Sequence, residues 1–357
     1  MSPLDWGVEA PWGPAAATSI GSLPGTSSQE AARVVTGELA EFVHVPELPG
    51  RGPGADMVGR TGGLLASVSA GLSMETTPAG WRFAMAPGRQ TRLAQAYLRE
   101  DLDALEENAT NYAGPVKVQV VGPWTMAAAV ELRTGERALR DPQAVWDIAQ
   151  ALGAALVDHV ADVRRRLPKA SVVVVQLDEP SLAAVREGRI GTASGLSSYR
   201  AVDDQDASRV LGEVLDAARS SDVLPGIHCC AFDVPVDLIR MSGASFVSLD
   251  FVPLLTERVL DDQIGRAFDA GLGIMAGTVP SIGSGDLGDA RASAPLRAVL
   301  HRLGLESEQW IRQVSVTPSC GLAGASPSWV RTALASCQAV GRVVRDDQEE
   351  EQEERGD

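Results

Sequence analysis

Residues 172–180 read Val-Val-Val-Val-Gln-Leu-Asp-Glu-Pro, an apolar run that ends in two acids and a proline. β-Branched residues favour strands, and a proline after a capping acid is typical of a helix start. Seven other short apolar runs also precede an amphipathic helical pattern. The eight predicted strands are Ala17–Ser22, Phe42–Pro46, Val116–Val121, Val172–Leu177, Leu224–Cys230, Phe246–Asp250, Leu272–Ala276 and Val314–Thr317.

Eight strand–helix units in about 330 residues favour one α/β domain, a (β/α)₈ TIM barrel, over two doubly wound domains. We expect an irregular N-terminal arm over residues 1–14, the barrel over residues 15–345 and a disordered acidic tail over residues 346–357. A long, lid-like loop is expected over residues 47–87. The predicted helices are Gln29–Leu39, Thr91–Tyr112, Asp141–Leu167, Ala207–Ser220, Val236–Met241, Glu257–Ala270, Ala290–Leu303 and Ser328–Val344.

The composition is that of a folded protein, with 45% hydrophobic and 22% charged residues, and the few cysteines favour a reducing, cytoplasmic setting. A net charge of −16, nearly half of it in the predicted tail, argues against a nucleic-acid partner. Membrane insertion is not expected, because no apolar run reaches about 20 residues. Four cysteines in a chain of 357 residues do not suggest a disulfide framework.

In a TIM barrel the functional residues lie at the C-terminal ends of the strands. Polar residues follow or end five of the predicted strands, and they are the candidates for a site. These residues are Ser22, Asp178, Glu179, His228, Cys230, Asp250 and Cys320.

The residues His228-Cys229-Cys230 lie at the end of a predicted strand. On a strand, residues two apart point to the same face and their neighbour points to the other. His228 and Cys230 are expected to face one site and Cys229 to face away from it. Cys320 and Asp250 end other strands of the same barrel. One imidazole, two thiolates and a carboxylate form a plausible Zn²⁺ site. The alternative is that the cysteines are small buried apolar residues.

Four segments occur in a recognisable order: Ser19–Pro24, Gln176–Ser181, His228–Cys230 and Pro318–Leu322. In this order they resemble segments of the C-terminal catalytic barrel of cobalamin-independent methionine synthase. The resemblance extends from about Thr18 to the helix before the acidic tail. That barrel is related to those of uroporphyrinogen decarboxylase and of zinc-dependent coenzyme M methyltransferases.

The resemblance implies zinc ligands and a substrate site. Zinc would be held by His228, Cys230, Asp250 and Cys320, and it would take up the sulfur of homocysteine. The resemblance places the ammonium of homocysteine at Asp178 and its carboxylate at the backbone of Ile20-Gly21-Ser22, where N–H groups suit an anion. Two local alternatives stay open: Asp178-Glu179 as a helix cap and Ser22 as a turn residue.

Three positions depart from the family's pattern. Asp250 stands where the family usually has a glutamate ligand, and Glu257 is a weaker alternative. Thr278 stands where the family has a histidine that gives a proton to the folate. Gly59 stands where a glutamate also binds the substrate amine, so that either Asp56 or Glu47 substitutes for it or this contact is lost. We also expect no counterpart of the N-terminal barrel of two-barrel methionine synthases, because 357 residues are too few for two barrels.

These observations predict a zinc-dependent methyltransferase that converts homocysteine to methionine. The donor is expected to be methyltetrahydrofolate or a methyl-corrinoid, which a corrinoid protein could present. The alternatives are a methyltransferase for another small thiol and a catalytically silent barrel that acts as a binding protein. Uroporphyrinogen decarboxylase activity, on a related barrel, would leave His228, Cys230 and Cys320 without a role.

Overall fold

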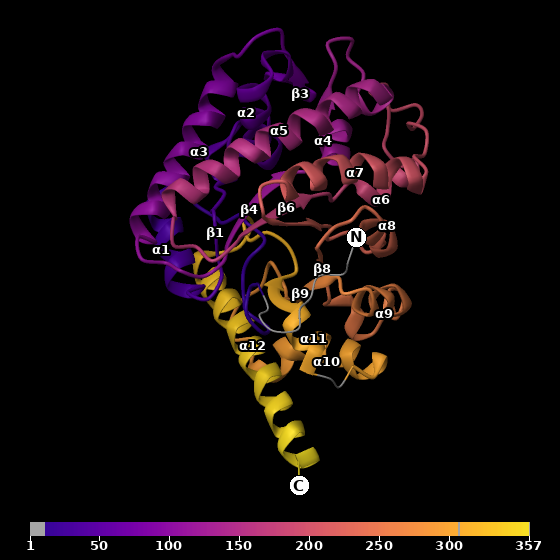
Figure 1. The fold of residues 1–357 in the computed structure, drawn as a ribbon. Coiled ribbons are helices and arrows are strands. Elements are labelled where there is room, and N and C mark those ends of the chain that lie inside the picture. The colour runs from indigo at the N-terminus through magenta and orange to yellow at the C-terminus, as the bar shows by residue number, and fades with distance from the viewer. Residues whose placement is uncertain (1–10, 306–307, 357) are drawn as a thin grey trace.

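Seven parallel strands form the central sheet of the chain, in the computed structural model that describes residues 11–305 and 308–356. Their order in the sheet follows the order in the chain, which is the arrangement that strand–helix units produce. Figure 1 shows the curled sheet. Its strands are β1 (Val43–His44), β4 (Val116–Val121), β6 (Val173–Asp178), β7 (Leu224–His228), β8 (Phe246–Asp250), β9 (Gly273–Val279) and β10 (Val314–Pro318).

The first predicted strand, Ala17–Ser22, contributes only isolated bridges. Ala17 bridges Val316 in β10, and Ser22 bridges Glu47 just after β1, so the segment is bonded to both edges of the sheet. It does not form a regular strand because the carbonyl of Ile20 accepts side-chain donors instead of a backbone N–H. Seven of the eight expected strands are therefore present as strands, and the eighth segment joins the two edges of the sheet.

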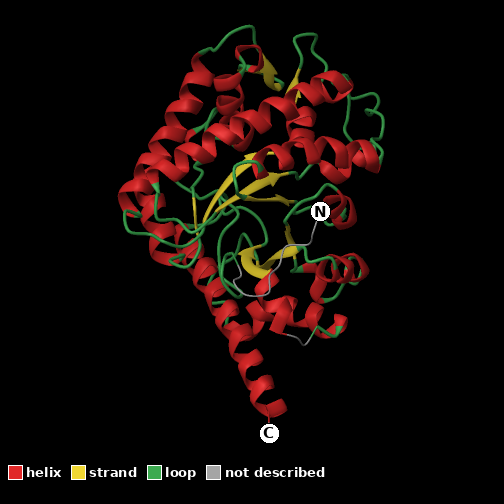
Figure 2. Cartoon of the chain, in the orientation of Figure 1, coloured by secondary structure: helices red, strands yellow, loops and turns green. Residues whose placement is uncertain are grey.

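Helices surround the sheet, as Figure 2 shows, and they bury their apolar faces against it. Seven of the eight predicted helices begin and end within about four residues of their predicted bounds. No helix in the described ranges combines the length and the apolar character that crossing a bilayer requires. The helices are α1 (Ser28–Glu38), α2 (Met57–Val68), α3 (Arg89–Asn108), α4 (Pro123–Ala129), α5 (Pro142–Arg166), α6 (Leu182–Arg186), α7 (Asp204–Arg219), α8 (Val236–Met241), α9 (Asp261–Asp269), α10 (Asp289–Leu303), α11 (Glu308–Gln313) and α12 (Pro327–Gly356), with short 3₁₀ turns at Pro49–Arg51, Ala70–Leu72, Ala138–Arg140 and Pro253–Leu255.

The predicted loop over residues 47–87 is wrong, because this stretch contains regular structure. Helix α2 is followed by a hairpin of β2 (Met74–Thr77) and β3 (Gly80–Phe83), and β5 (Val130–Glu131) extends the hairpin to a three-stranded sheet. Asp56 caps α2, and the indole of Trp81 on β3 donates a hydrogen bond to the same carboxylate. The cap and the hairpin therefore stabilise one another, a tertiary effect that local sequence patterns do not reveal.

The predicted disordered tail also differs from the structure, which continues α12 through Asp346 to Gly356. Glutamate and glutamine are good helix formers, and no proline or glycine interrupts residues 342–355. Near the start of this stretch, Arg297 of α10 forms an ion pair with Asp347 at 3.2 Å. In Figure 1 the end of α12 extends away from the sheet. Asp357 lies outside the described residues.

An apolar plug fills the interior of the sheet at the N-terminal ends of the strands. Trp12 stacks on Phe42 and meets Phe246 edge-on, with ring centroids at 6.3 and 5.8 Å. Ala16, Val174 and Met275 complete the cluster. The predicted irregular arm thus holds a core residue, since Trp12 is buried, whereas residues 1–10 lie outside the described residues.

Replacing Trp12 by alanine should lower the free energy of unfolding by about 3–5 kcal/mol, because it leaves a cavity in this plug. The measurement is chemical denaturation followed by circular dichroism. Phe232→Ala is the matched control, since Phe232 is 55% exposed, and it should change stability by less than about 0.5 kcal/mol. Equal effects of the two substitutions would contradict the assigned packing.

Candidate functional site

The carboxyl ends of the parallel strands bring three soft ligands together. Asp178, His228 and Ser248 are partners in register on β6, β7 and β8, so they form one row across the sheet. Cys230 follows β7 by two residues, and Cys320 follows β10 by two. The ligand atoms of His228, Cys230 and Cys320 all lie within 4.8 Å of one another. The structure therefore brings together three of the four predicted metal ligands.

The imidazole of His228 is oriented by its neighbour. Its Nδ1 lies 3.0 Å from the hydroxyl of Ser248, and its Nε2 is buried without a hydrogen-bond partner among the described residues. In metal-binding histidines, a hydrogen bond at one ring nitrogen fixes the orientation of the ring, and the other nitrogen binds the metal. His228 is thus arranged to use Nε2 as a ligand atom.

The thiols of Cys230 and Cys320 form a hydrogen-bonded pair with their Sγ atoms 3.2 Å apart. The hydrogen bond with Cys230 lowers the pKa of Cys320 to about 4, and the charge of the neighbouring His228 acts in the same direction. The same hydrogen bond, together with burial, raises the pKa of Cys230. The pair is therefore readily held as a thiol and a thiolate, the form that binds metals.

Asp250 lies near this cluster but outside the group of three. Its Oδ1 accepts a hydrogen bond from the Val252 N–H at 2.8 Å, and burial raises its pKa. The charge of Cys320 also raises the pKa of Asp250, and that of His228 lowers it, so these groups interact. Glu257 is exposed after the 3₁₀ turn at Pro253–Leu255. Which carboxylate completes a metal site stays a prediction, and the electrostatic coupling favours Asp250.

The turn Ile20-Gly21-Ser22 lies beside Cys320. The Ser22 carbonyl accepts a hydrogen bond from Leu322, and the Ser22 hydroxyl lies so close to Gly321 that a Cβ there would come within 2.1 Å of it. The N–H groups of the three turn residues donate no hydrogen bond in the described part of the chain. They remain available to an acceptor such as an anion.

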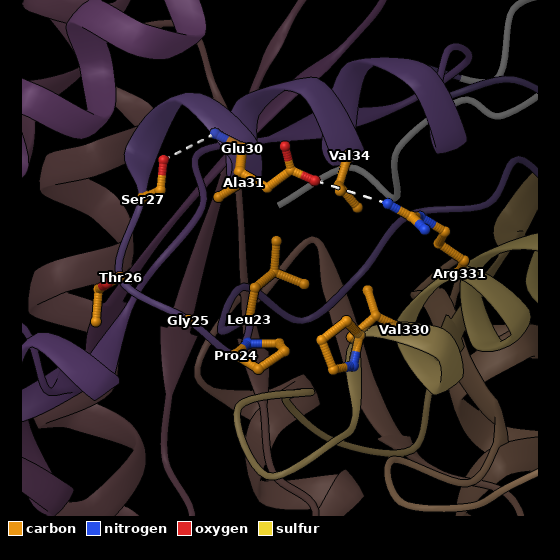
Figure 3. A pocket seen from close by; sticks show the side chains of 11 residues that line it. Leu23, Pro24, Gly25, Thr26, Ser27, Glu30, Ala31, Val34, Val330 and Arg331 are labelled. Atoms are coloured by element: carbon orange, nitrogen blue, oxygen red, sulfur yellow. Dashed lines mark hydrogen bonds and ion pairs between the residues drawn. The ribbon is translucent and has the colours of Figure 1, made fainter.

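A small apolar pocket of about 250 Å³ opens next to this turn, between the start of α1 and the start of α12. Figure 3 shows Leu23, Pro24 and Val330 around it, and the ion pair of Glu30 with Arg331 at 3.6 Å across one side. None of the predicted site residues lines this pocket. It is therefore distinct from the metal-ligand cluster.

Asp178 and Glu179 have different roles. Asp178 is buried, accepts a hydrogen bond from Gln176 at 2.7 Å, and has its pKa raised by burial. Glu179 accepts from the N–H groups of Trp124 and Thr125 and from the Thr125 hydroxyl. Glu179 therefore caps α4, the helix of the preceding unit, and leaves Asp178 to face the site.

Glu47, not Asp56, reaches the site. Asp56 is occupied as a helix cap, with hydrogen bonds from the N–H groups of Gly54 and Gly59 and from Trp81. None of its contacts in the described ranges joins it to Asp178. Glu47 is buried, with an Arg60 ion pair at 3.5 Å. Burial raises the pKa of Glu47 to about 7, and the charge of Asp178 contributes to the rise, so the two carboxylates interact.

Position 59 has no space for a side chain. A Cβ on Gly59 would come within 2.5 Å of the Trp81 ring and 2.8 Å of the Gly54 backbone. The hairpin therefore occupies the volume where the resemblance places a second acid. Thr278, the other substituted position, is buried on β9, and its hydroxyl has no partner among the described residues.

Two buried polar residues under the site, Lys117 and Gln119, were not predicted from the sequence, and we call them the polar floor. Lys117 and Gln119 alternate with the outward-facing Val116, Val118 and Val120 on β4 and are buried inside the sheet. The Lys117 ammonium donates to the Ile20 carbonyl at 2.7 Å, and the Gln119 amide donates to the Val45 carbonyl at 2.6 Å. Polar residues at every second position of an otherwise valine-rich strand were the available signal.

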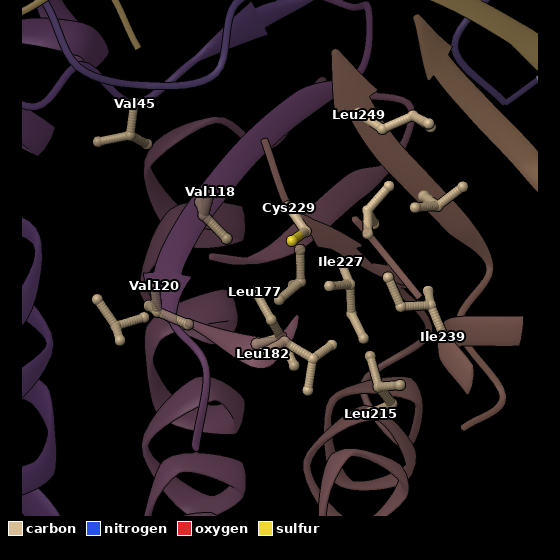
Figure 4. Packing of buried hydrophobic residues seen from close by; sticks show 14 of the residues in the cluster. Val45, Val118, Val120, Leu177, Leu182, Leu215, Ile227, Cys229, Ile239 and Leu249 are labelled. Atoms are coloured by element: carbon tan, nitrogen blue, oxygen red, sulfur yellow. The ribbon is translucent and has the colours of Figure 1, made fainter. Parts of the chain in front are cut away.

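Cys229 faces the opposite side of β7, which confirms the prediction from strand alternation. Its side chain is buried with Leu177 and Ile227 in the large hydrophobic cluster, as Figure 4 shows. Burial raises the pKa of the Cys229 thiol to about 12. Cys337, on α12, is likewise buried, and burial raises its pKa.

A parallel α/β barrel-like sheet with a His–Cys–Cys cluster at its strand ends defines a protein with a candidate metal centre at a TIM-like mouth. The family model "Cobalamin-independent synthase, Catalytic domain" matches residues 84–342. The chain therefore belongs to this family, the catalytic domain of methionine synthase-like enzymes. Among curated proteins, none matches the sequence.

A solved structure supports the same fold. A B12-independent methionine synthase from Shewanella sp. W3-18-1, in complex with selenomethionine, is 12% identical, with a TM-score of 0.60 over 94% of this chain and 99% of that one. Two other structures are less similar. A morphinone reductase in complex with tetrahydroNAD is 14% identical, with a TM-score of 0.41 over 88% and 85% of the two chains. An L-ribulose 3-epimerase is 13% identical, with a TM-score of 0.35 over 73% and 92%.

We predict that two of the four thiols react in the native protein after treatment with a chelator. Cys230 and Cys320 are partly exposed, whereas Cys229 and Cys337 are buried. The pKa of Cys320 is lowered, and alkylation of Cys320 removes the hydrogen bond that raises the pKa of Cys230, so both exposed thiols should react. Alkylation with iodoacetamide followed by peptide mass spectrometry measures this. Labelling of Cys229 as fast as Cys320 would contradict the burial pattern, and denatured protein, in which all four react, is the control.

Proposed function

We propose that this protein is a zinc-dependent methyltransferase that moves a methyl group to the thiol of homocysteine and so forms methionine. The observation that supports it best is the His228, Cys230 and Cys320 cluster beside two buried carboxylates and a turn with unused N–H groups. The first element suits a metal-held thiol, and the other two suit the ammonium and the carboxylate of an amino acid. Membership of the family supports the same activity.

The residues fit zinc by their chemistry. Zinc accepts nitrogen and sulfur ligands in tetrahedral sites, where bonds of about 2.0–2.3 Å place the ligand atoms roughly 3.3–3.8 Å apart. His228 would use its unpaired Nε2, Cys230 and Cys320 their sulfurs, and Asp250 a carboxylate oxygen. When bound, the metal would keep the homocysteine sulfur deprotonated at neutral pH, and a thiolate is the nucleophile that attacks a methyl group.

The substrate's ammonium would lie between Asp178 and Glu47. Both carboxylates are buried, so a cation that pairs with them gains more than it would in water. Its carboxylate would accept hydrogen bonds from the turn at Ile20-Gly21-Ser22. This distribution of charge favours an amino acid over a sulfonate thiol such as coenzyme M, which lacks the ammonium.

The methyl donor is methyltetrahydrofolate or a methyl-corrinoid, and we favour the corrinoid. Release of the methyl group from a folate nitrogen requires a proton donor, whereas release from cobalt does not. Thr278 offers only a hydroxyl in the position where the resemblance places a histidine. His44, inside the sheet, has its pKa lowered by burial to about 3 and is neutral near pH 7. A corrinoid protein is accordingly the proposed partner.

Cys320→Ala should remove both bound zinc and methyl transfer, since it deletes a ligand, while Cys229→Ala should retain zinc and cost mainly stability. The measurements are metal content by elemental analysis of protein purified without chelator, and homocysteine methylation. Loss of zinc from Cys229→Ala would contradict the assignment of the ligands. A wild-type protein that carries no zinc and binds none would support the silent binding protein instead.

Methyl transfer should be at least about tenfold faster with methylcobalamin than with methyltetrahydrofolate when the zinc-loaded protein and homocysteine are held constant. Methionine formation, followed by mass spectrometry, measures it. Equal turnover with methyltetrahydrofolate would refute the preference for a corrinoid and leave the acceptor unchanged. Replacing homocysteine by coenzyme M in the same assay tests the acceptor, and faster methylation of coenzyme M would refute the homocysteine assignment.

A further inference from the structure

A lone buried ammonium lies under the proposed substrate site. Lys117 is one of two lysines in a chain with 31 basic residues, and its side chain is 0% exposed. Its only hydrogen bond among the described residues is the 2.7 Å bond from Nζ to the Ile20 carbonyl, and no ion pair joins it to a carboxylate there. Removing a cation from water lowers the stability of the folded protein when it has so few partners, so we expect Lys117 to serve a function.

The ammonium stays charged because of its surroundings. Burial lowers the pKa of Lys117 to about 8, and the charges of Asp178 and Glu47 raise it. Lys117 is therefore mostly protonated at neutral pH and keeps its donors.

The Ile20 carbonyl has a second donor. The Gln176 amide donates to it at 3.0 Å and to Asp178 at 2.7 Å, so Gln176 is itself fixed. Two donors from β4 and β6 hold this oxygen toward the interior of the sheet. In a trans peptide the N–H points opposite to the C=O. The N–H of Gly21 consequently points away from Lys117 and Gln176, and it donates no hydrogen bond among the described residues.

Position 21 has to be glycine for this arrangement. Gly21 has a φ of +153°, and a Cβ there would lie 2.8 Å from the Gln119 side chain. The Gln119 amide is fixed in turn by its bond to Val45. Floor and turn are thus in direct contact, with no side chain of residue 21 between them.

We propose that Lys117, together with Gln176, is a positioning residue that orients the Ile20–Gly21 peptide so that the Gly21 N–H binds the carboxylate of the amino-acid substrate. This inference rests on the proposed function, because it assumes an amino-acid ligand. It assigns Lys117 a role in the choice of ligand and none in contact with the reacting atoms. The positive charge also strengthens the donor, since it polarises the peptide whose oxygen it holds.

The test compares two ligands that differ only in the carboxylate: L-methionine and L-methioninol. The wild-type, zinc-loaded protein should bind L-methionine about 10- to 100-fold more tightly, the range expected for a hydrogen bond to a charged group. Lys117→Met should reduce this ratio to less than about threefold. Gln176→Met should reduce it in the same direction, although Gln176 carries no charge. Isothermal titration calorimetry measures the dissociation constants.

The ratio of the two dissociation constants reports the contribution of the carboxylate alone, because both compounds share the ammonium and the thioether. Changes beside Asp178 or partial unfolding affect both ligands equally and cancel. Lys169→Met replaces the only other lysine, which is exposed and bonded to Asn111, and should leave the ratio unchanged.

A wild-type ratio that survives in both Lys117→Met and Gln176→Met would overturn the positioning role. Loss of the ratio in Lys117→Met alone would do so as well, because it would indicate a simple charge effect. If Lys117→Met does not fold, Gln176→Met decides by itself. A wild-type protein that binds neither compound would refute the proposed function, an outcome distinguishable from failure of the Lys117 assignment.

Discussion

The hydrogen bonds of residues 15–23 hold the two edges of the sheet together. Thr18 and Ala16 pair with Val316 on β10, and Leu23 and Gly21 pair with Glu47 after β1. Without these bonds β1 and β10 would be free edges of an open sheet. The loops that follow them would then not be held around one common site. The site depends on this closure, because Cys320 follows one edge strand, Glu47 follows the other, and Cys230 comes from the middle of the sheet. The turn that joins the edges also carries the N–H groups assigned to the substrate.

Local periodicity explains why much of this could be predicted from the sequence. Buried parallel strands are short β-branched runs, and their two-residue alternation is enough to separate His228 and Cys230 from Cys229. The predictions for Asp56 and for the strand at Ala17–Ser22 failed because both segments are determined by residues far away in the sequence. Asp56 acts as a cap because Trp81, 25 residues later, packs over Gly59. The strand at Ala17–Ser22 is irregular because side chains from β4 and β6 take its carbonyl.

The metal cluster and the polar floor differ in how they can be found. Thiols and an imidazole at strand ends are recognisable by residue type, and the family resemblance implies the same role for them. The residue types of Lys117 and Gln119 do not by themselves indicate a place in the site, because polar residues inside a predicted strand usually face solvent. Here both faces of the sheet are covered, so inward polar residues must find partners inside it. Their partners are the backbone carbonyls of Ile20 and Val45, which is how the interior determines the conformation of the site above it.

The buried Trp12 has a consequence for the order in which the protein is assembled. Its partner Phe246 lies more than 230 residues further along the chain, and the backbone partners of Ala15 and Thr18, Ile311 and Val316, lie later still. A ribosome makes the N-terminal segment first, and Phe42 and Glu47 follow soon after, but the backbone partners on β10 emerge only near the end of synthesis. The earliest part of the chain is thus among the last to gain all of its contacts. The ligand set that includes Cys320 is likewise completed only at the end of synthesis, when loop-closure entropy for contacts of such separation can at last be offset.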